Sequence, residues 1–117
     1  MTDVTLKVKN PKDPSKMFEG KFLVDSGATY TVVPANILEK LGIEPYGKEE
    51  FSLADVSRTI KRKVGGALYE YDGRKGVAPV VFGKKGDSQL LGAFTLEALG
   101  LTLDSLKRRL YKARLRM

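Results

Sequence analysis

The run Phe22-Leu23-Val24-Asp25-Ser26-Gly27-Ala28-Thr29 decides how this chain is interpreted. Its three apolar residues are typical of a buried strand, and the strand ends at Asp25 in a turn of small residues. A carboxylate at the end of an apolar strand is costly to bury, so the fold must either satisfy it locally or use it in chemistry. Gly27 lets the backbone approach another group closely, and Ser26 places a hydroxyl beside the carboxylate.

The same run also has a simpler interpretation as a turn. Asp-Ser-Gly is common in turns, because Asp and Ser bond their local backbone and Gly takes a positive φ. A second element, at residues 88–101, favours a functional site instead. There Leu90 and Leu91 form an apolar pair, Gly92 follows, and a short helix-like stretch ends at Gly100.

In order and spacing, the two elements resemble those of the retropepsin-like aspartic proteases. In that family an apolar strand ends in Asp-Thr/Ser-Gly, and two apolar residues and a Gly precede a helix later in the chain. The chain looks most like the small prokaryotic members of the family, which have stretches similar to Leu53-Ala54-Asp55, Val80-Val81-Phe82-Gly83 and Leu91–Gly100. The resemblance covers roughly residues 4–110. It implies an all-β closed barrel with one or two short helices, forming one domain over 1–117 and working as a two-fold homodimer.

The resemblance implies a role for each residue of the loop. Asp25 is the catalytic carboxylate of an aspartic endopeptidase. Ser26 resembles the hydroxyl that hydrogen-bonds across the dimer axis, and Gly27 the residue whose backbone approaches both carboxylates and substrate. Ala28 is similar to the family's small pocket-lining residue, and Thr29 completes the supporting loop.

Two further segments have implied roles. Leu90, Leu91 and Gly92 resemble the strand behind the active-site loop, where Gly avoids a clash. Residues 51–64 stand where the family has its flap hairpin, which closes over a bound peptide. The implied substrate contacts at the flap tip are Asp55, Val56 and Ser57. Without the resemblance, the polar tip of this segment is also typical of an ordinary surface hairpin.

The chain departs from the viral members of the family at two positions. They commonly have an Asp at the place of Thr29 and an Arg at the place of Ala93, and this pair ties the loop to the helix. Since neither charge is present here, we expect the hydroxyl of Thr29, or packing, to support the loop. The flap also lacks the Gly-rich tip of the viral enzymes and the Tyr of pepsins.

Composition excludes several other kinds of site. The 117 residues include neither Cys nor His, so disulfides, thiolate or His-ligated metal sites and His-dependent nucleophiles are excluded. Carboxylates are therefore the strongest acid-base candidates. The length favours one domain, and we find no apolar run long enough to span a membrane and no signal-peptide core. We expect a cytoplasmic protein without cofactor, metal or membrane partner.

The pattern along the chain predicts short strands, tight turns and little helix. A hairpin is expected from Val4–Lys9 and Met17–Val24 around a turn at 10–15, and a strand at Tyr30–Val33 before a helix that begins at Pro34 and is capped by Gly42. Further strands are expected at 51–54, 58–64, 67–71 and 77–82, with a turn at Asp72-Gly73.

The last segment, Leu103–Met117, fits a strand or a helix by its periodicity. The resemblance favours a basic strand over about 109–117, since the chain termini of retropepsins pair across the dimer. Six cations between Lys107 and Arg116 contribute much of the formal net charge of +7. They also raise the alternative of nucleic-acid binding, but the other basic residues are scattered and no nucleic-acid module is recognisable, so we do not expect that partner.

The chemistry of an aspartic peptidase needs two carboxyls that share one proton. The chain has one Asp-Ser-Gly, so a working site needs Asp25 from each of two chains. The same fold without activity remains an alternative, because a peptide held between flap and loop by strand-like bonds is bound whether or not it is cut.

Overall fold

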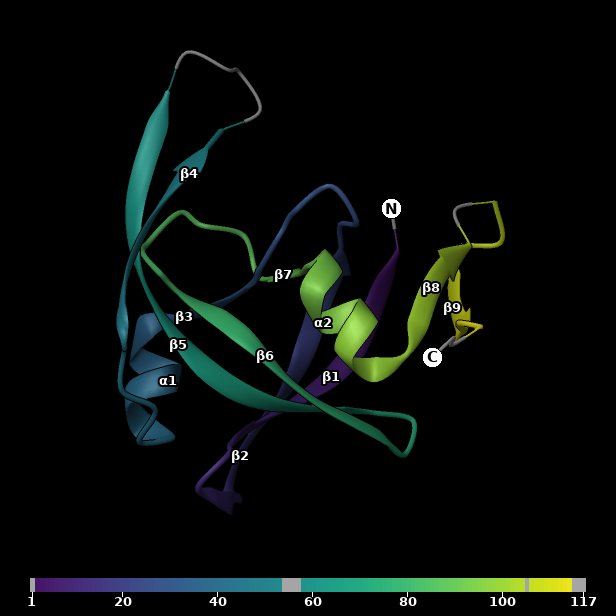
Figure 1. Cartoon of the computed structure of the whole chain (residues 1–117), viewed down its shortest axis with the longest axis horizontal. Helices are drawn as coiled ribbons and strands as arrows, with labels where there is room; N and C mark the ends of the chain where they lie inside the picture. Colours follow the sequence, from purple (N-terminus) through teal and green to yellow (C-terminus); the bar gives the residue numbers. More distant parts are fainter. Residues whose placement is uncertain (1, 54–57, 105, 115–117) are drawn as a thin grey trace.

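The computed structural model describes residues 2–53, 58–104 and 106–114 (Figure 1). This part of the chain is built mainly from strands. They are β1 (Asp3–Asn10), β2 (Asp13–Val24), β3 (Thr31–Pro34), β4 (Gly47–Ser52), β5 (Thr59–Tyr71), β6 (Arg74–Gly83), β7 (Leu90–Leu91), β8 (Leu101–Asp104) and β9 (Arg109–Lys112). The short helices α1 (Ala35–Lys40) and α2 (Ala93–Leu99) lie between them.

Six of the strands form a closed barrel. Hydrogen-bonded neighbours follow the order β1-β2-β7-β3-β6-β5, and an antiparallel pairing of β1 with β5 joins the two ends of that order. β4 lies outside this ring and pairs with the first half of β5. Together these two segments form a hairpin that projects away from the barrel (Figure 1). Closure leaves few open strand edges to pair with other chains. The predicted all-β closed barrel with short helices is confirmed.

The pairing of β7 brings the two sequence motifs together. β7 runs parallel to the end of β2, with Leu23 opposite Leu90 and Val24 opposite Leu91. Its other edge pairs antiparallel with β3 at Val32. The carboxyl end of β2, where Asp25 follows, therefore lies beside the strand that precedes Gly92.

Alternating apolar residues of these strands fill the barrel. Phe22 and Val24 point inward from β2, as the apolar run predicted, and Leu91 is fully buried beside them. α2 adds Leu96 and Leu99 to the same core. At about 25 cal/mol per Å² of apolar surface removed from water, burial of these large side chains is the main stabilising term of the fold.

The observed elements differ from the predicted ones in several places. β4 begins at Gly47, four residues before the predicted strand at 51–54, and the strand β8 was not predicted. β5 is one strand through Gly65 and Gly66, where separate strands at 58–64 and 67–71 were predicted. A Cβ at Gly65 would lie 3.0 Å from the carbonyl oxygen of Glu44, so this glycine permits close packing and does not mark a break. Pro34 is extended and ends β3, so α1 begins one residue later. The first turn is shorter than predicted, because β2 already begins at Asp13.

Other local predictions are confirmed. The turn Asp72-Gly73 has positive φ at both residues (49° and 78°), and Gly42 and Gly100 follow the two helices with positive φ. The C-terminal segment is a strand at β9, but it pairs with β8 of the same chain. Pairing of the termini across a dimer stays a prediction. Residues 115–117 and the flap-tip residues Asp55, Val56 and Ser57 lie outside the described residues.

Candidate active site

The candidate catalytic carboxylate lies at the end of β2. The backbone N–H of Asp25 donates to the carbonyl oxygen of Leu91 at 3.0 Å, which extends the β2–β7 pairing by one residue. Asp25 itself is half-buried, between the buried Val24 and the exposed Ser26 and Gly27. The fold thus places this carboxylate at the surface, with its backbone fixed to the barrel.

The loop that follows is the Asx-type turn that the tripeptide predicts. The Gly27 N–H donates to Oδ1 of Asp25 at 3.0 Å, and the Ala28 N–H donates to the Asp25 carbonyl oxygen at 3.1 Å. A Cβ at Gly27 would lie 3.2 Å from the same Oδ1, which is tighter than an ordinary contact. The turn therefore orients the carboxylate, so the structural and the functional interpretation of Asp-Ser-Gly apply together.

The N-terminus of α2 fixes the other half of the loop. The Ala93 N–H donates to the carbonyl oxygen of Ala28 at 2.8 Å, and the Phe94 N–H donates to that of Thr29 at 3.1 Å. The first amides of a helix have no partner within the helix, so here they are free to bond the loop. These backbone bonds link the loop to the helix where the viral proteins use a charged pair.

A buried hydroxyl pair lies directly beneath the loop. Oγ1 of Thr31 accepts the Gly92 N–H at 3.0 Å and is 2.6 Å from Oγ1 of Thr95. Both threonines are completely buried. We expected support from the Thr29 hydroxyl or from packing. Thr29 is exposed, and the buried hydroxyl in this loop region belongs to Thr31, two residues later.

Tyr69 of β5 completes this buried polar cluster. It is fully buried, and its hydroxyl donates to the Pro79 carbonyl oxygen at 3.0 Å. Burial raises the pKa of Tyr69 far above its usual range, and the neighbouring hydroxyls of Thr95 and Thr31 oppose this shift only in part. The hydroxyl of Tyr69 therefore stays neutral and places no negative charge beneath the Asp25 carboxylate.

An aromatic cluster connects the loop to the flap and to α2. The ring of Tyr30 meets Phe51 of β4 edge to face at a centroid distance of 5.7 Å, and Phe94 of α2 at 5.4 Å. Such pairs contribute about 0.5–1.5 kcal/mol beyond their buried area. The position of the flap base is thus coupled by packing to the active-site loop.

A cleft of about 590 Å³ opens beside the loop. Gly27, Ala28 and Thr29 form one side, the flap strands another, and Leu90 part of the floor. Apolar side chains supply much of the remaining lining, namely Tyr30, Val32, Phe51, Leu53, Ile60 and Val81. Asp25 does not line this cavity but adjoins it through its bond to Gly27.

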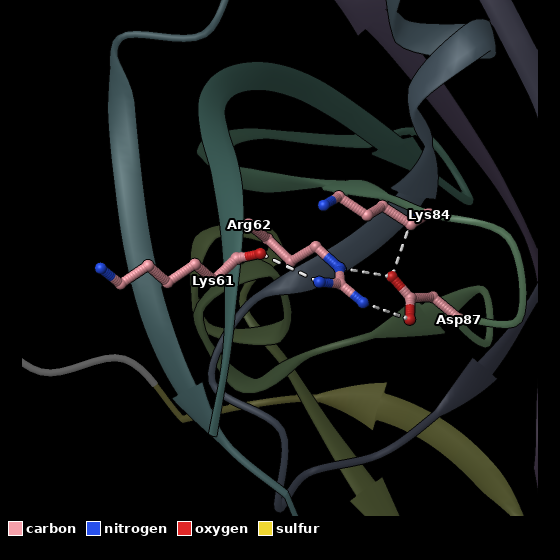
Figure 2. A network of polar contacts seen from close by, with 4 residues as sticks. All are labelled: Lys61, Arg62, Lys84 and Asp87. Atoms are coloured by element: carbon pink, nitrogen blue, oxygen red, sulfur yellow. Dashed lines mark hydrogen bonds and ion pairs between the residues drawn. The ribbon is translucent and has the colours of Figure 1, made fainter. Parts of the chain in front are cut away.

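Two residues that line the cleft, Arg62 and Asp87, form an ion pair, which Figure 2 shows from close by. Nε and Nη2 of Arg62 donate to Oδ2 and Oδ1 of Asp87 at 2.8 Å and 3.0 Å, and the Lys84 N–H also donates to Oδ2. These hydrogen bonds and the positive charges hold the pKa of Asp87 below its usual range. The pair joins the second flap strand to the loop at 84–89, and this bidentate geometry is the strongest that Arg and a carboxylate form.

The fold thus brings most of the predicted site residues together. Asp25 through Thr29 form one loop, and Leu90, Leu91 and Gly92 lie behind it. The sequence interpretation missed the buried threonines, Tyr69, the aromatic cluster and the Arg62–Asp87 pair. One signal was present: Thr95 follows Gly92 by one helical turn, so a helix predicted there places its hydroxyl at the same end as the loop.

Comparison with known proteins adds information on the fold. No protein-family profile matches the sequence, and no curated protein matches it. Among solved structures, the chain is similar to the solution structure of simian foamy virus (mac) protease. The likeness covers 80% of this chain and 92% of that one, with a TM-score of 0.52 and 23% sequence identity. This chain therefore shares its fold with that protease.

Proposed function

We propose that this protein is an aspartic endopeptidase that hydrolyses peptide bonds with a pair of Asp25 carboxyl groups, one from each subunit of a homodimer. The observation that carries the proposal is the loop itself. A half-buried carboxylate at the end of β2 is oriented by the Gly27 N–H, tied to β7 and α2, and placed beside a largely apolar cleft. The retropepsin-like fold, similar to that of the simian foamy virus protease, supports the same function.

The proposed reaction uses the two carboxyl groups in different protonation states. The ionised Asp25 removes a proton from water, and the water oxygen forms a bond to the scissile carbonyl carbon. The protonated Asp25 of the other subunit donates to the carbonyl oxygen as negative charge develops there. The tetrahedral intermediate then breaks its C–N bond, and a carboxyl group transfers a proton to the leaving amine.

The dimer is part of the proposal because each chain supplies one such loop. Two Asp25 side chains meeting at a two-fold axis are too close to be charged together, so in this proposal they share one proton. Ser26, exposed next to Asp25, is proposed to hydrogen-bond across that axis. The apolar cleft of each subunit then holds one half of an extended peptide, with main-chain bonds to the flap.

A cleavage assay across pH tests this function. We expect the wild-type protein to cut members of an uncharged, mainly apolar peptide library, with mass spectrometry identifying the products. Activity should disappear as pH rises past the point where the shared proton leaves the dyad, because the carbonyl then loses its acid. Peptides that bind but stay intact at every pH at which the protein is folded contradict the proposal in favour of an inactive peptide-binding module.

A further inference from the structure

A second hollow lies on the other side of Arg62 from the candidate cleft, since this residue lines both cavities. It has a volume of about 500 Å³ and is enclosed by the end of α1, the segment that follows it, β5 and the start of the 84–89 loop. We call it the basic hollow. Its charged lining, besides Arg62, consists of Lys48, Lys61, Lys63, Lys84, Glu39 and Glu44.

The lysines of the basic hollow carry more charge than the fold compensates. Four lysines stand against two glutamates in this lining, and all six side chains are exposed. Outside the lining, Glu50 of β4 lies opposite Lys61, so Lys48 and Lys63 form the cross-strand pair of like charge. Lys48 lies directly opposite Lys63 in the β4–β5 register. Like charges at opposed positions of an antiparallel pair are destabilising, so this arrangement weakens the hairpin unless an anion binds there.

Arg62 and Asp87 already bond each other (Figure 2). The guanidinium of Arg62 is bonded to Asp87 and to the carbonyl oxygen of Lys61, and Asp87 accepts both Arg62 and the Lys84 N–H. The ammonium groups of Lys61 and Lys84 take no part in this network. Among the described residues, the ion pairs are Lys9–Glu70 and Arg62–Asp87, so neither involves a lysine of the basic hollow.

We infer that the basic hollow binds an acidic peptide segment, with Lys48 and Lys63 as its main carboxylate contacts. The floor of the hollow is apolar, from Ile43, Pro45 and Phe82, and suits the aliphatic stems and backbone of such a segment. Carboxylates between Lys48 and Lys63 also relieve the repulsion between the two ammonium groups. The inference concerns binding alone and is independent of whether Asp25 hydrolyses peptides.

The chemistry of the hollow favours a peptide over a nucleic acid. Arg62, the arginine of the hollow and the best residue for bidentate phosphate contacts, is committed to Asp87. Phe82 is the aromatic residue of the lining. Only 5% of its surface is exposed, so it offers no face on which a base could stack.

A calorimetric titration tests the inference. The probe is a blocked octapeptide of alternating Glu and Ala, and its matched control has Gln in place of Glu. We expect the Glu peptide to bind the full-length protein at low salt and the Gln peptide not to bind. The double variant Lys48→Gln/Lys63→Gln should lose about tenfold or more in affinity, because two unscreened contacts are removed.

The control variant Lys75→Gln/Lys112→Gln removes the same charge from exposed positions on β6 and β9, away from the hollow. It should change the affinity much less, because neither lysine lines the hollow and a distant charge contributes less than a direct contact. In amide NMR spectra of the wild type, the Glu peptide should shift resonances of 43–48 and 61–63. Three results would overturn the inference. The two double variants could lose equal affinity for the Glu peptide, or the peptide could shift only amide resonances of 106–114. An oligothymidylate of equal charge could also bind more tightly at the same lysines.

Discussion

Asp25→Asn is expected to lower peptide hydrolysis by about a thousandfold or more while the barrel stays folded. The substitution keeps the shape of the side chain, and the amide oxygen still accepts the Gly27 N–H that orients it. It removes the ionisable group from both halves of the proposed dyad at once. No group is then left to take the proton from water, so the loss should appear in kcat, measured with a cleaved peptide from the library.

The matched control is Asp72→Asn in the β5–β6 turn. Asp72 is exposed and has a φ of 49°, a conformation that Asn tolerates well, so this variant should retain wild-type activity and stability. Activity of Asp25→Asn equal to that of Asp72→Asn is incompatible with an aspartic mechanism.

Gly92→Ala is expected to destabilise the protein by about 3 kcal/mol and to abolish activity with it. A Cβ at Gly92 would lie 2.6 Å from both the carbonyl carbon and the carbonyl oxygen of Tyr30. Backbone cannot rotate away from such a contact as a flexible side chain can, so the loop or α2 must shift. Since the φ of Gly92 is −94°, alanine adopts this conformation without strain, and the cost is steric.

Denaturant unfolding of Gly92→Ala beside Gly47→Ala measures this effect. A Cβ at Gly47 meets no atom within 4 Å, so alanine there should leave the unfolding free energy unchanged or raise it slightly. A small increase is expected because alanine lowers the conformational entropy of the unfolded chain. Equal unfolding free energies for the two variants would show that the close approach of Gly92 to the active-site loop does not exist.

The sequence was informative where the signal is local. The apolar run before Asp25, the pair Leu90-Leu91 and the glycines after them each follow from hydrophobic pattern and turn chemistry. Family resemblance supplied the adjacency of β2 and β7, which no local pattern contains. With that adjacency, most of the predicted loop residues come together as expected.

The parts that could not be predicted depend on long-range pairing. Thr31 and Thr95 are 64 residues apart in the sequence, and a single threonine is typical of any half-buried surface. Only the fold brings their Oγ1 atoms to within 2.6 Å of each other. Gly65 and Gly66 indicate a break by local rules, yet both pair with β6 and so belong to β5, and Gly65 also packs against the segment after α1. The pairing of Arg62 with Asp87 depends on the position of the flap, which side-chain type alone does not define.

Subunit mixing tests the central claim most directly, namely that one active site takes Asp25 from two chains. Wild type and Asp25→Asn are refolded together at constant total protein and varied ratio, with wild type and Asp72→Asn as the control mixture. Because a mixed dimer then holds one carboxyl, activity should follow the square of the wild-type fraction and fall to about a quarter at equal amounts. A linear decline to about one half means that each chain works alone and contradicts the shared site.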